Sequence, residues 1–387
     1  MIRCQTMPAL ETRVHDSIDE IEPAMWDSLL KPGDYLASHR FVGVCERSGI
    51  GAAQFRHVLV FEGGALAGLA SLFRMDVPLD LLTTGVTRRL FDLARRLKPS
   101  LTRVPVVFCG LPVSLGGSCL RIAPNRAASE VVACITAAME DFAAETKTGF
   151  LCCKEFAQQE QNLFAAALGA SGFFSVPSQP GCKLDIHWHD WPDYQGSLRA
   201  GYRRQLRLDR RAMEGVGLRF EHGSGLLPDI ATVHRLYGQV MARATLKMEV
   251  LPEHFFRLLG QAASGRLHSI VGYLGDRPVA NAILLWQPPA CHFLLAGLDY
   301  AALRPGHVYQ NLVTEVVRTA ITLGAEHLEL GQTSCDFKGR LGALPTPRFI
   351  WLKHGGRMRH GFLAHAAPWL FPQPETKPRK VFNADQS

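Results

Sequence analysis

The same order of predicted helices and strands occurs twice along this chain, and the second copy begins about 190 residues after the first. Apolar residues at helical spacing and short β-rich runs mark the elements. The dipeptides Gly63-Gly64 and Gly275-Asp276 each predict a tight hairpin turn between two strands. A repeat of this length is too large for one unit of a solenoid, so it indicates that a mixed α/β unit is duplicated.

The elements are predicted from periodicity and turn residues. The predicted strands are Arg56–Phe61, Leu66–Met75, Val104–Cys109, Phe150–Cys153, Lys183–Trp188, Leu267–Leu274, Pro278–Trp286, Cys291–Leu298, His327–Gly331 and Arg348–His354. The predicted helices are 18–48, Ala127–Thr146, Asn162–Ala170, Ser197–Met213, Leu227–Ala244, Pro252–Ala263 and Gly306–Leu323. We therefore expect an α/β protein with two domains, each a mixed twisted sheet flanked by helices.

The boundary between the domains is predicted in the polar stretch His189–Tyr194. This places the first domain over residues 1–190 and the second over 191–366. Residues 367–387 contain several prolines and are predicted to be a loose tail. Residues 79–103 interrupt the first domain and are predicted to be an insertion.

Composition excludes several classes of protein. With 47% apolar and 20% charged residues, the chain can form a packed core and is not a disordered protein. Its 10 cysteines include no CxxC spacing, so we predict no metal site and no dithiol redox motif. The charge-free stretches Val104–Leu120 and Pro278–Leu298 both contain prolines, and the N-terminal residues lack the apolar segment of a signal peptide. We expect a cytoplasmic protein without a membrane span.

The segment that begins at Leu298 is the first candidate site. A strand ends there, a turn follows at Pro305-Gly306, and a long helix begins. Free backbone N–H groups at such a helix start can face a negatively charged group. Arg304 and His307 add side-chain donors beside it. The alternative interpretation is a turn that only starts a helix.

The loop after the predicted strand His327–Gly331 is the second candidate site. Its polar residues are Glu329, Gln332, Asp336, Lys338 and Arg340. Loops just past strand ends commonly carry the sites of α/β proteins. The alternative is a solvated loop with surface ion pairs, which contribute little to stability.

A set of spaced positions between Pro278 and His354 carries a family resemblance. The positions are Pro278-Val279-Ala280-Asn281, Pro305-Gly306, Ala320, Gly324, Glu329, Gly331, Lys338 and Gly342. With them, the chain resembles the GNAT superfamily of acyltransferases, and within it the FemAB-like branch, in which two GNAT units stand in tandem. The resemblance extends to the start of the chain through Trp26, His39, Phe41, Glu46 and Gly49. It implies that each predicted domain is a GNAT-like unit.

The resemblance also implies a reaction, because GNAT enzymes move an acyl group from a thioester, usually of coenzyme A, to an amine. Coenzyme A thioester would then be a co-substrate, and no tightly bound cofactor is expected. The candidate catalytic residues are His307, Glu329 and Asp336 as proton acceptors, Lys338 for the oxyanion, and Tyr309 or Tyr300 as proton donor to the leaving thiolate. The candidate donor-binding residues are Arg304, Gly306, His307, Gln310, Arg203 and Arg204. Direct transfer needs no nucleophilic thiol, so no catalytic role is expected for Cys335.

Two segments are strongly basic in a chain of net charge +7. Arginines of the segment Ser197–Arg211 fall along one stripe of a helix and predict an anionic partner: the phosphates of the donor, a phospholipid surface or tRNA. The insertion 79–103 combines leucines at helical spacing with basic residues. This pattern is typical of a helix at a membrane surface or of a lid over an acyl channel. In both segments the alternative is an ordinary solvated or packed helix.

We expect an N-acyltransferase that joins an acyl group, with a long chain favoured by the basic insertion, to an amphiphilic amine such as a sphingoid base. Bacterial ceramide synthases resemble the same GNAT branch. The first alternative is an aminoacyl-tRNA-dependent, FemAB-like peptide ligase, the only interpretation that involves nucleic acid. The second is a non-catalytic module that binds a membrane surface or a partner. In the main interpretation, the protein contacts the inner membrane face through residues 79–103.

Overall fold

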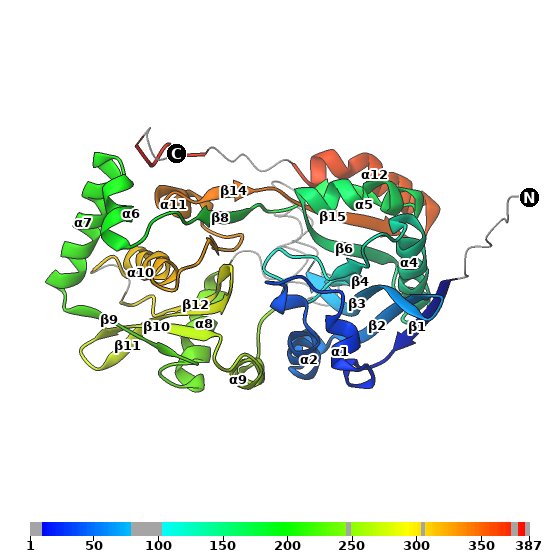
Figure 1. Ribbon diagram of the computed structural model, residues 1–387, viewed down its shortest axis with the longest axis horizontal. Helices are drawn as coiled ribbons and strands as arrows, with labels where there is room; N and C mark the ends of the chain where they lie inside the picture. The colour runs from blue at the N-terminus through cyan, green and yellow to red at the C-terminus, as the bar shows by residue number, and fades with distance from the viewer. Residues whose placement is uncertain (1–9, 79–102, 245–248, 303–305, 373–377, 384–387) are drawn as a thin grey trace, which may run out of the picture. The chain divides into compact units, whose positions relative to one another are not determined.

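The computed structural model describes residues 10–78, 103–244, 249–302, 306–372 and 378–383 (Figure 1). The chain forms two compact units. Unit 1 comprises residues 1–178 and 348–373, and unit 2 comprises residues 179–347 and 374–387. Each unit contains a mixed sheet with helices packed on it, which confirms the predicted α/β class with two units of the same kind.

The sheet of unit 1 has the strand order β1-β2-β3-β4-β6-β15-β7, and β5 pairs with β3. The bounds are β1 Leu10–His15, β2 Gln54–Glu62, β3 Ala65–Pro78, β4 Arg103–Cys109, β5 Leu120–Ile122, β6 Phe150–Ala157, β7 Phe174–Pro177 and β15 Arg348–His354. Strands β4 and β6 are parallel and the other pairs are antiparallel. The predicted hairpin joins β2 and β3. Its two turn glycines both have positive φ, the backbone conformation that such turns require.

The main helix of unit 1 is α4, Ala128–Glu145, which packs on β1, β2, β3, β4 and β6. It buries Val131, Ile135 and Phe142, which recur at helical spacing in the sequence. The other helices are α1 Pro23–Asp27, α2 His39–Arg47, α5 Gln158–Ala170 and α12 Arg357–Leu370, with short 3-10 turns at Ile18–Glu20, Tyr35–Ala37 and Ile50–Ala52. The prediction of one helix over 18–48 was wrong. Pro32 and Gly33, whose φ is 93°, separate the short helices in that stretch.

The sheet of unit 2 has the strand order β14-β8-β13-β12-β11-β10-β9. The bounds are β8 Gly181–Asp185, β9 Leu218–Ser224, β10 Leu267–Leu274, β11 Arg277–Gln287, β12 Ala290–Leu298, β13 His327–Glu329 and β14 Leu344–Thr346. Strands β12 and β13 are parallel, as β4 and β6 are in unit 1. The predicted Gly275-Asp276 hairpin joins β10 and β11.

The helices of unit 2 position its candidate site. They are α6 Trp191–Ser197, α7 Ala200–Gly215, α8 Ile230–Arg243, α9 Glu253–Ala262, α10 Val308–Thr322 and α11 Cys335–Arg340. Helix α10 packs on β10, β11, β12 and β13 and contacts α7. Its buried face includes Leu312, Val316 and Ala320, so the start of α10 is held firmly against the sheet and α7.

The unit boundaries differ from the predicted domains. Strand β15, predicted in the second domain, lies in unit 1, where it pairs with both β6 and β7. Strand β8, predicted in the first domain, lies in unit 2 between β13 and β14. The tail is not wholly loose: α12 runs to Leu370, Val381 is buried, and Phe382 bridges to Leu198. Sequence order misled the prediction because the chain returns to unit 1 after completing most of unit 2.

Except for Arg103, the predicted insertion 79–103 lies outside the described residues, and so does Arg304. Among the described helices, none combines the length and the apolar character needed to cross a bilayer.

Candidate functional site

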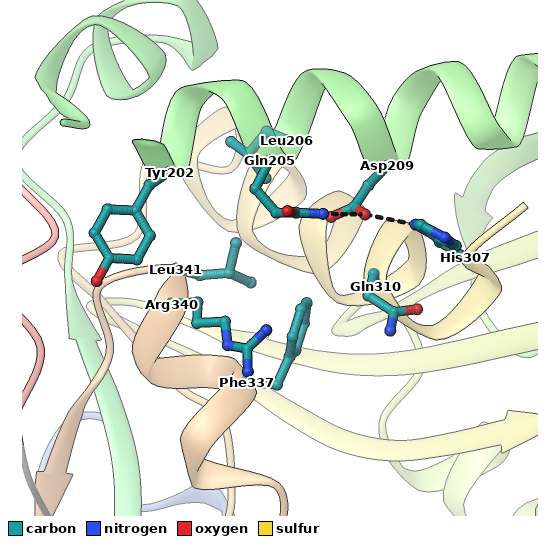
Figure 2. Close-up of a pocket in the computed structure, with 9 residues that line it drawn as sticks. All are labelled: Tyr202, Gln205, Leu206, Asp209, His307, Gln310, Phe337, Arg340 and Leu341. Carbon is teal, nitrogen blue, oxygen red and sulfur yellow. Dashed lines mark hydrogen bonds and ion pairs between the residues drawn. The ribbon is translucent and has the colours of Figure 1, made fainter. Parts of the chain in front are cut away.

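A pocket of about 120 Å³ lies in unit 2 between α7, the start of α10 and α11 (Figure 2). Its walls mix apolar and polar side chains. They are Tyr202, Gln205, Leu206 and Asp209 of α7, His307 and Gln310 at the start of α10, and Phe337, Arg340 and Leu341 in and after α11. Unit 2 therefore brings the first candidate segment, part of the second, and the arginine-rich helix to one place.

The centre of the polar wall is a pair formed by His307 and Asp209 (Figure 2). Oδ1 of Asp209 lies 2.6 Å from Nδ1 of His307 and accepts a second hydrogen bond from Nε2 of Gln205 at 2.9 Å. Because a carboxylate only accepts hydrogen bonds, Nδ1 carries the ring proton and Nε2 is the basic nitrogen. Asp209 is buried while His307 is partly exposed, so the proton-accepting atom belongs to the residue that solvent and substrate can reach.

The backbone around His307 is fixed from below by Asn311, a buried residue one turn along α10. Its Nδ2 donates to the carbonyl oxygens of Asp209 and Gly306, both at 2.9 Å. Gly306 has a φ of 89°, and a Cβ there would lie 2.6 Å from a methyl carbon of Val216. His307 itself adopts the left-handed conformation with a φ of 49°. Such strain in a residue other than glycine is concentrated at functional sites.

Helix α7 reaches the pocket because its two faces differ. Tyr202, Leu206 and Asp209 recur three or four positions apart and so share the inner face. The arginines at 204, 207, 210 and 211 are exposed. Asp209 is therefore an acid on the apolar face of a helix whose outer face is cationic.

The structure brings together some of the predicted site residues. His307 and Gln310 line the pocket, and Gly306 directly precedes the histidine that pairs with Asp209. Arg203 and Arg204 lie on α7, where Arg203 donates to the carbonyl oxygen of Gly196 at 3.2 Å. Neither arginine lines the pocket.

Lys338 is not among the pocket residues. Its side chain is buried, and Nζ donates to the carbonyl oxygen of Leu330 at 2.6 Å and to that of Thr333. Burial lowers the pKa of this ammonium. These contacts hold the loop that leads into α11, so in this structure the ammonium of Lys338 stabilises the backbone of that loop.

The two carboxylates proposed as proton acceptors also lie outside the pocket wall. Glu329 is in β13, in register with Lys183 of β8. Asp336 is exposed and forms ion pairs with Arg379 and with Arg340; its carboxylate lies 3.0 Å from the guanidinium of Arg340. These two guanidinium groups lower the pKa of Asp336. A carboxylate held ionised in this way is a weak proton acceptor.

The two tyrosines lie on either side of the α10 start in the sequence. Tyr309 is on α10, its ring centroid lies 5.6 Å from that of Phe337, and burial raises the pKa of its hydroxyl, so it keeps its proton at neutral pH. Tyr300 stacks under the guanidinium of Arg243, with the Cζ atom 4.1 Å from the ring centroid. Neither lines the pocket, but Tyr309 packs against a residue that does.

Cys335 is half-buried at the start of α11, next to Cys182 of β8. A hydrogen bond from the Cys182 thiol and the nearby charge of Lys338 lower the pKa of Cys335. Its sulfur lies 3.8 Å from the carbonyl oxygen of Pro180 and does not line the pocket.

The sequence interpretation missed Asp209, Asn311 and Tyr202 as site residues. For Asp209 a signal exists in retrospect: it is the only acid between Ser197 and Arg211, and it falls at apolar spacing from Leu206. No local signal marks Asn311, because its partners become neighbours only when α7 and α10 pack. Among the described residues, no group of three or more histidine, cysteine or acidic side chains could hold a metal ion.

A protein-family model covers most of the pocket in sequence. Residues 197–339 match the family model of the acetyltransferase (GNAT) domain, and this range contains every pocket-lining residue except Arg340 and Leu341. No curated protein sequence matches the chain.

Solved structures share the fold over nearly the whole length. A crystal structure of FemX is 12% identical, with a TM-score of 0.54 over 92% of this chain and 100% of its own. A tandem GNAT protein from the clavulanic acid biosynthesis pathway is 13% identical, with a TM-score of 0.54 over 90% and 99%. The C-terminal domain of a proposed lysylphosphatidylglycerol synthetase from Agrobacterium fabrum is 12% identical, with a TM-score of 0.52 over 93% and 100%. Identities this low show the fold alone. The chain thus has the tandem GNAT fold, and its residues 197–339 match the acetyltransferase domain of the GNAT family.

Proposed function

We propose that this protein is an N-acyltransferase that moves an acyl group from a thioester to an amine at the pocket of unit 2. The observation that carries the proposal is the pair of His307 and Asp209 in the wall of that pocket. A histidine with one nitrogen held by a buried carboxylate and the other available is suited to act as a general base.

In the proposed reaction, Nε2 of His307 takes a proton from the ammonium of the acceptor, and the neutral nitrogen attacks the thioester carbonyl carbon. The C–N bond forms, the C–S bond breaks, and the sulfur leaves as a thiolate. The second nitrogen proton passes to the thiolate, with Tyr309 as the candidate relay, so the products are an amide and a free thiol. Asp209 keeps the imidazole oriented and stabilises its protonated form.

Coenzyme A thioester is the proposed donor. The first N–H groups of α10, directly after His307, have no partners within the helix, which suits a pyrophosphate. Arg203 and Arg204 add positive charge one to two turns before Asp209 on α7. Arg304 remains a proposed donor contact from the sequence.

The proposed acceptor is an amine that carries an apolar group. Leu206, Phe337 and Leu341 form the apolar part of the wall, and Tyr202 adds an aromatic ring (Figure 2). A sphingoid base fits this chemistry: its amine would enter the pocket, while its long chain would extend beyond so small a space.

The experiment is a mass-spectrometric assay of the purified full chain with short- and long-chain acyl-CoAs and a panel of amines that includes sphinganine, together with measurement of released thiol. His307→Gln should lower kcat/KM by about 10²–10⁴. The control His254→Gln replaces an exposed histidine of α9 in the same unit and should leave the rate unchanged.

Asp209→Asn should also slow turnover, because the amide can donate to Nδ1 and so place the ring proton on Nε2, the atom that has to accept the substrate proton. A His307→Gln variant with normal turnover would remove His307 from the mechanism. Failure of every acyl-CoA to react with every amine would reject the coenzyme A proposal.

The exposed arginines of α7 favour one second candidate, in which the activated donor is an aminoacyl-tRNA. Arg204, Arg207 and Arg211 point to solvent, and on this helix Arg210 pairs with Glu214 at 2.9 Å. A row of cations suits a polyphosphate backbone. Incubation with charged tRNA in place of acyl-CoA, followed by detection of an aminoacylated amine, distinguishes the two donors.

A further inference from the structure

The outer face of α12 exposes an unusual amount of apolar surface. Among the described residues, the three most exposed large apolar side chains all lie on this helix of unit 1: Met358 at 91%, Phe362 at 74% and Trp369 at 70%. Single exposed apolar residues are normal on a protein surface, whereas three on one short helix mark an interaction site.

These three side chains share one face. At about 100° per residue, Met358, Phe362 and Trp369 fall within about 40° of each other around the helix axis. The opposite side contacts β15 and β7, buries Ala367 and partly buries Leu363. The face with Met358, Phe362 and Trp369 therefore remains exposed when α12 is packed on unit 1.

The charge of α12 is entirely of one sign. Arg357 and Arg359 are exposed at its start, and His360 and His365 follow, while no aspartate or glutamate occurs between Arg357 and Leu370. The ring of His365 lies edge-on to that of Trp369, with the centroids 5.5 Å apart. An aromatic and apolar ridge flanked by cations is complementary to a surface that is apolar inside and anionic outside.

We propose that the outer face of α12 docks onto a bilayer containing anionic phospholipid, with Phe362 and Trp369 entering the interface and Arg357 and Arg359 contacting the headgroups. Trp and Phe are favoured at this depth, and one helix lying in the plane of the interface needs no deep groove. A second copy of the chain is a poorer occupant, because two such faces carry the same charge and three side chains fall short of the roughly 800 Å² per partner of a stable interface. This inference stands apart from the proposed acyltransferase activity, since it concerns unit 1 and is tested without turnover.

The test is sedimentation of the full chain with vesicles of phosphatidylcholine alone or with about 30% phosphatidylglycerol, on the order of the anionic content of charged membranes. The wild type should bind the anionic vesicles more tightly. Phe362→Gln combined with Trp369→Gln should weaken that binding at least about tenfold. Arg357→Gln combined with Arg359→Gln should weaken it by about fivefold per arginine and leave binding to neutral vesicles unchanged.

The matched control is Val14→Gln, which replaces an exposed apolar residue of β1, the opposite edge strand of the same sheet, and should not change binding. The tryptophan fluorescence of the wild type should shift to shorter wavelength on anionic vesicles, and this shift should be absent in Trp369→Phe. Unchanged vesicle binding in the folded Phe362/Trp369 variant would overturn the proposal. So would equal binding to neutral and anionic vesicles, or a dimer in sedimentation that the same variant abolishes.

Discussion

At the scale of single residues, each unit contains a buried lysine that donates hydrogen bonds to the backbone of a loop. In unit 1, Nζ of Lys154 donates to the carbonyl oxygen of Leu111 at 2.9 Å and lies near the ring of Phe108. In unit 2, Lys338 donates to two carbonyl oxygens of its loop and lies near the ring of Phe293. A buried ammonium is costly unless its hydrogen bonds are made, so both lysines serve to hold loop backbone at the end of a strand.

This comparison gives a prediction for Lys338→Met. The variant should lower the free energy of unfolding by about 1–3 kcal/mol, because two carbonyl oxygens lose their donor. Turnover of the folded variant should change less than tenfold, in contrast to His307→Gln. Urea denaturation and steady-state kinetics measure the two effects. A loss of turnover by orders of magnitude at unchanged stability would restore the oxyanion role that the family resemblance implies.

A second residue-scale network lies in unit 1 around Glu46. Burial raises the pKa of this carboxylate, but hydrogen bonds from His57, from the Ser17 hydroxyl and from the backbone N–H of Ile18 outweigh that effect and lower its pKa to about 2. The distances are 2.8 Å to Nε2 of His57, 2.6 Å to Ser17 and 2.9 Å to Ile18. The network ties Ser17 and Ile18 to α2 and β2.

Glu46 should therefore contribute to acid stability. Between its usual pKa of 4.5 and about 2, the unfolded chain binds the proton and the folded chain does not. The contribution is complete above pH 4.5 and is lost as the pH falls toward 2. Glu46→Gln should cost about 2–3 kcal/mol at pH 7 and flatten the stability slope in that acid range. The exposed Glu22→Gln is the control for denaturation curves from neutral pH down to about 2; an equal slope in both variants would contradict the assignment.

At the scale of elements, β15 decides whether unit 1 is complete. It pairs with β6 on one side and β7 on the other, and Trp351 is buried, with its indole N–H donating to Oε1 of Gln161 at 2.8 Å. Without β15, the facing edges of β6 and β7 would both be unpaired and the core of unit 1 would be open. Unit 1 therefore depends on residues that follow unit 2 in the sequence.

A fragment of residues 1–190 should consequently fail to fold, although it matches the domain predicted from the sequence. A shortened chain that links residue 178 to residue 348 by a flexible segment and ends at residue 373 should fold, because it restores β15 and α12. Amide hydrogen exchange checks this: β6 should be protected in the linked chain and unprotected in 1–190. Protection of β6 in both would show that β15 is dispensable.

At the scale of the whole molecule, the charges behind the net charge of +7 differ in whether a neighbouring carboxylate pairs with them. Many cations are neutralised locally, as Arg257 is by Glu253 and Arg318 by Glu315. The outer face of α7 keeps an excess of positive charge beside the pocket. Exposed charges of this kind act on an anionic donor over about 8–10 Å at physiological salt and are screened beyond that.

Removing some of the exposed arginines of α7 should weaken binding of the donor and leave the rate of the chemical step unchanged. Arg204→Gln combined with Arg207→Gln should raise the KM for acyl-CoA several-fold, reduce the loss of activity with added salt, and leave kcat unchanged. Arg257→Gln combined with Arg318→Gln removes the same net charge from unit 2 and should have little effect. Identical salt dependence in the two variants would exclude a role for the α7 arginines in donor capture.

Much of the fold follows from local pattern. The hairpins around Gly63-Gly64 and Gly275-Asp276 and the long helices α4 and α10 form where periodicity predicts them, because turn chemistry and apolar spacing act over a few residues. The short strand β9 was missed. It is largely exposed and pairs along one side with β10, and Leu218 and Phe220 are its only large apolar residues, which is too short an apolar pattern to predict a strand.

The sequence by itself therefore determined the two hairpins, the long helices and the duplicated α/β architecture, and it placed His307 at a helix start. Only the tertiary structure decided which unit each strand joins and which polar residue meets His307. The physical reason is distance along the chain: Asp209 lies 98 positions from His307, and Trp351 lies 190 positions from Gln161. Contacts of that range depend on how packed helices and sheets fit together, which no local propensity encodes.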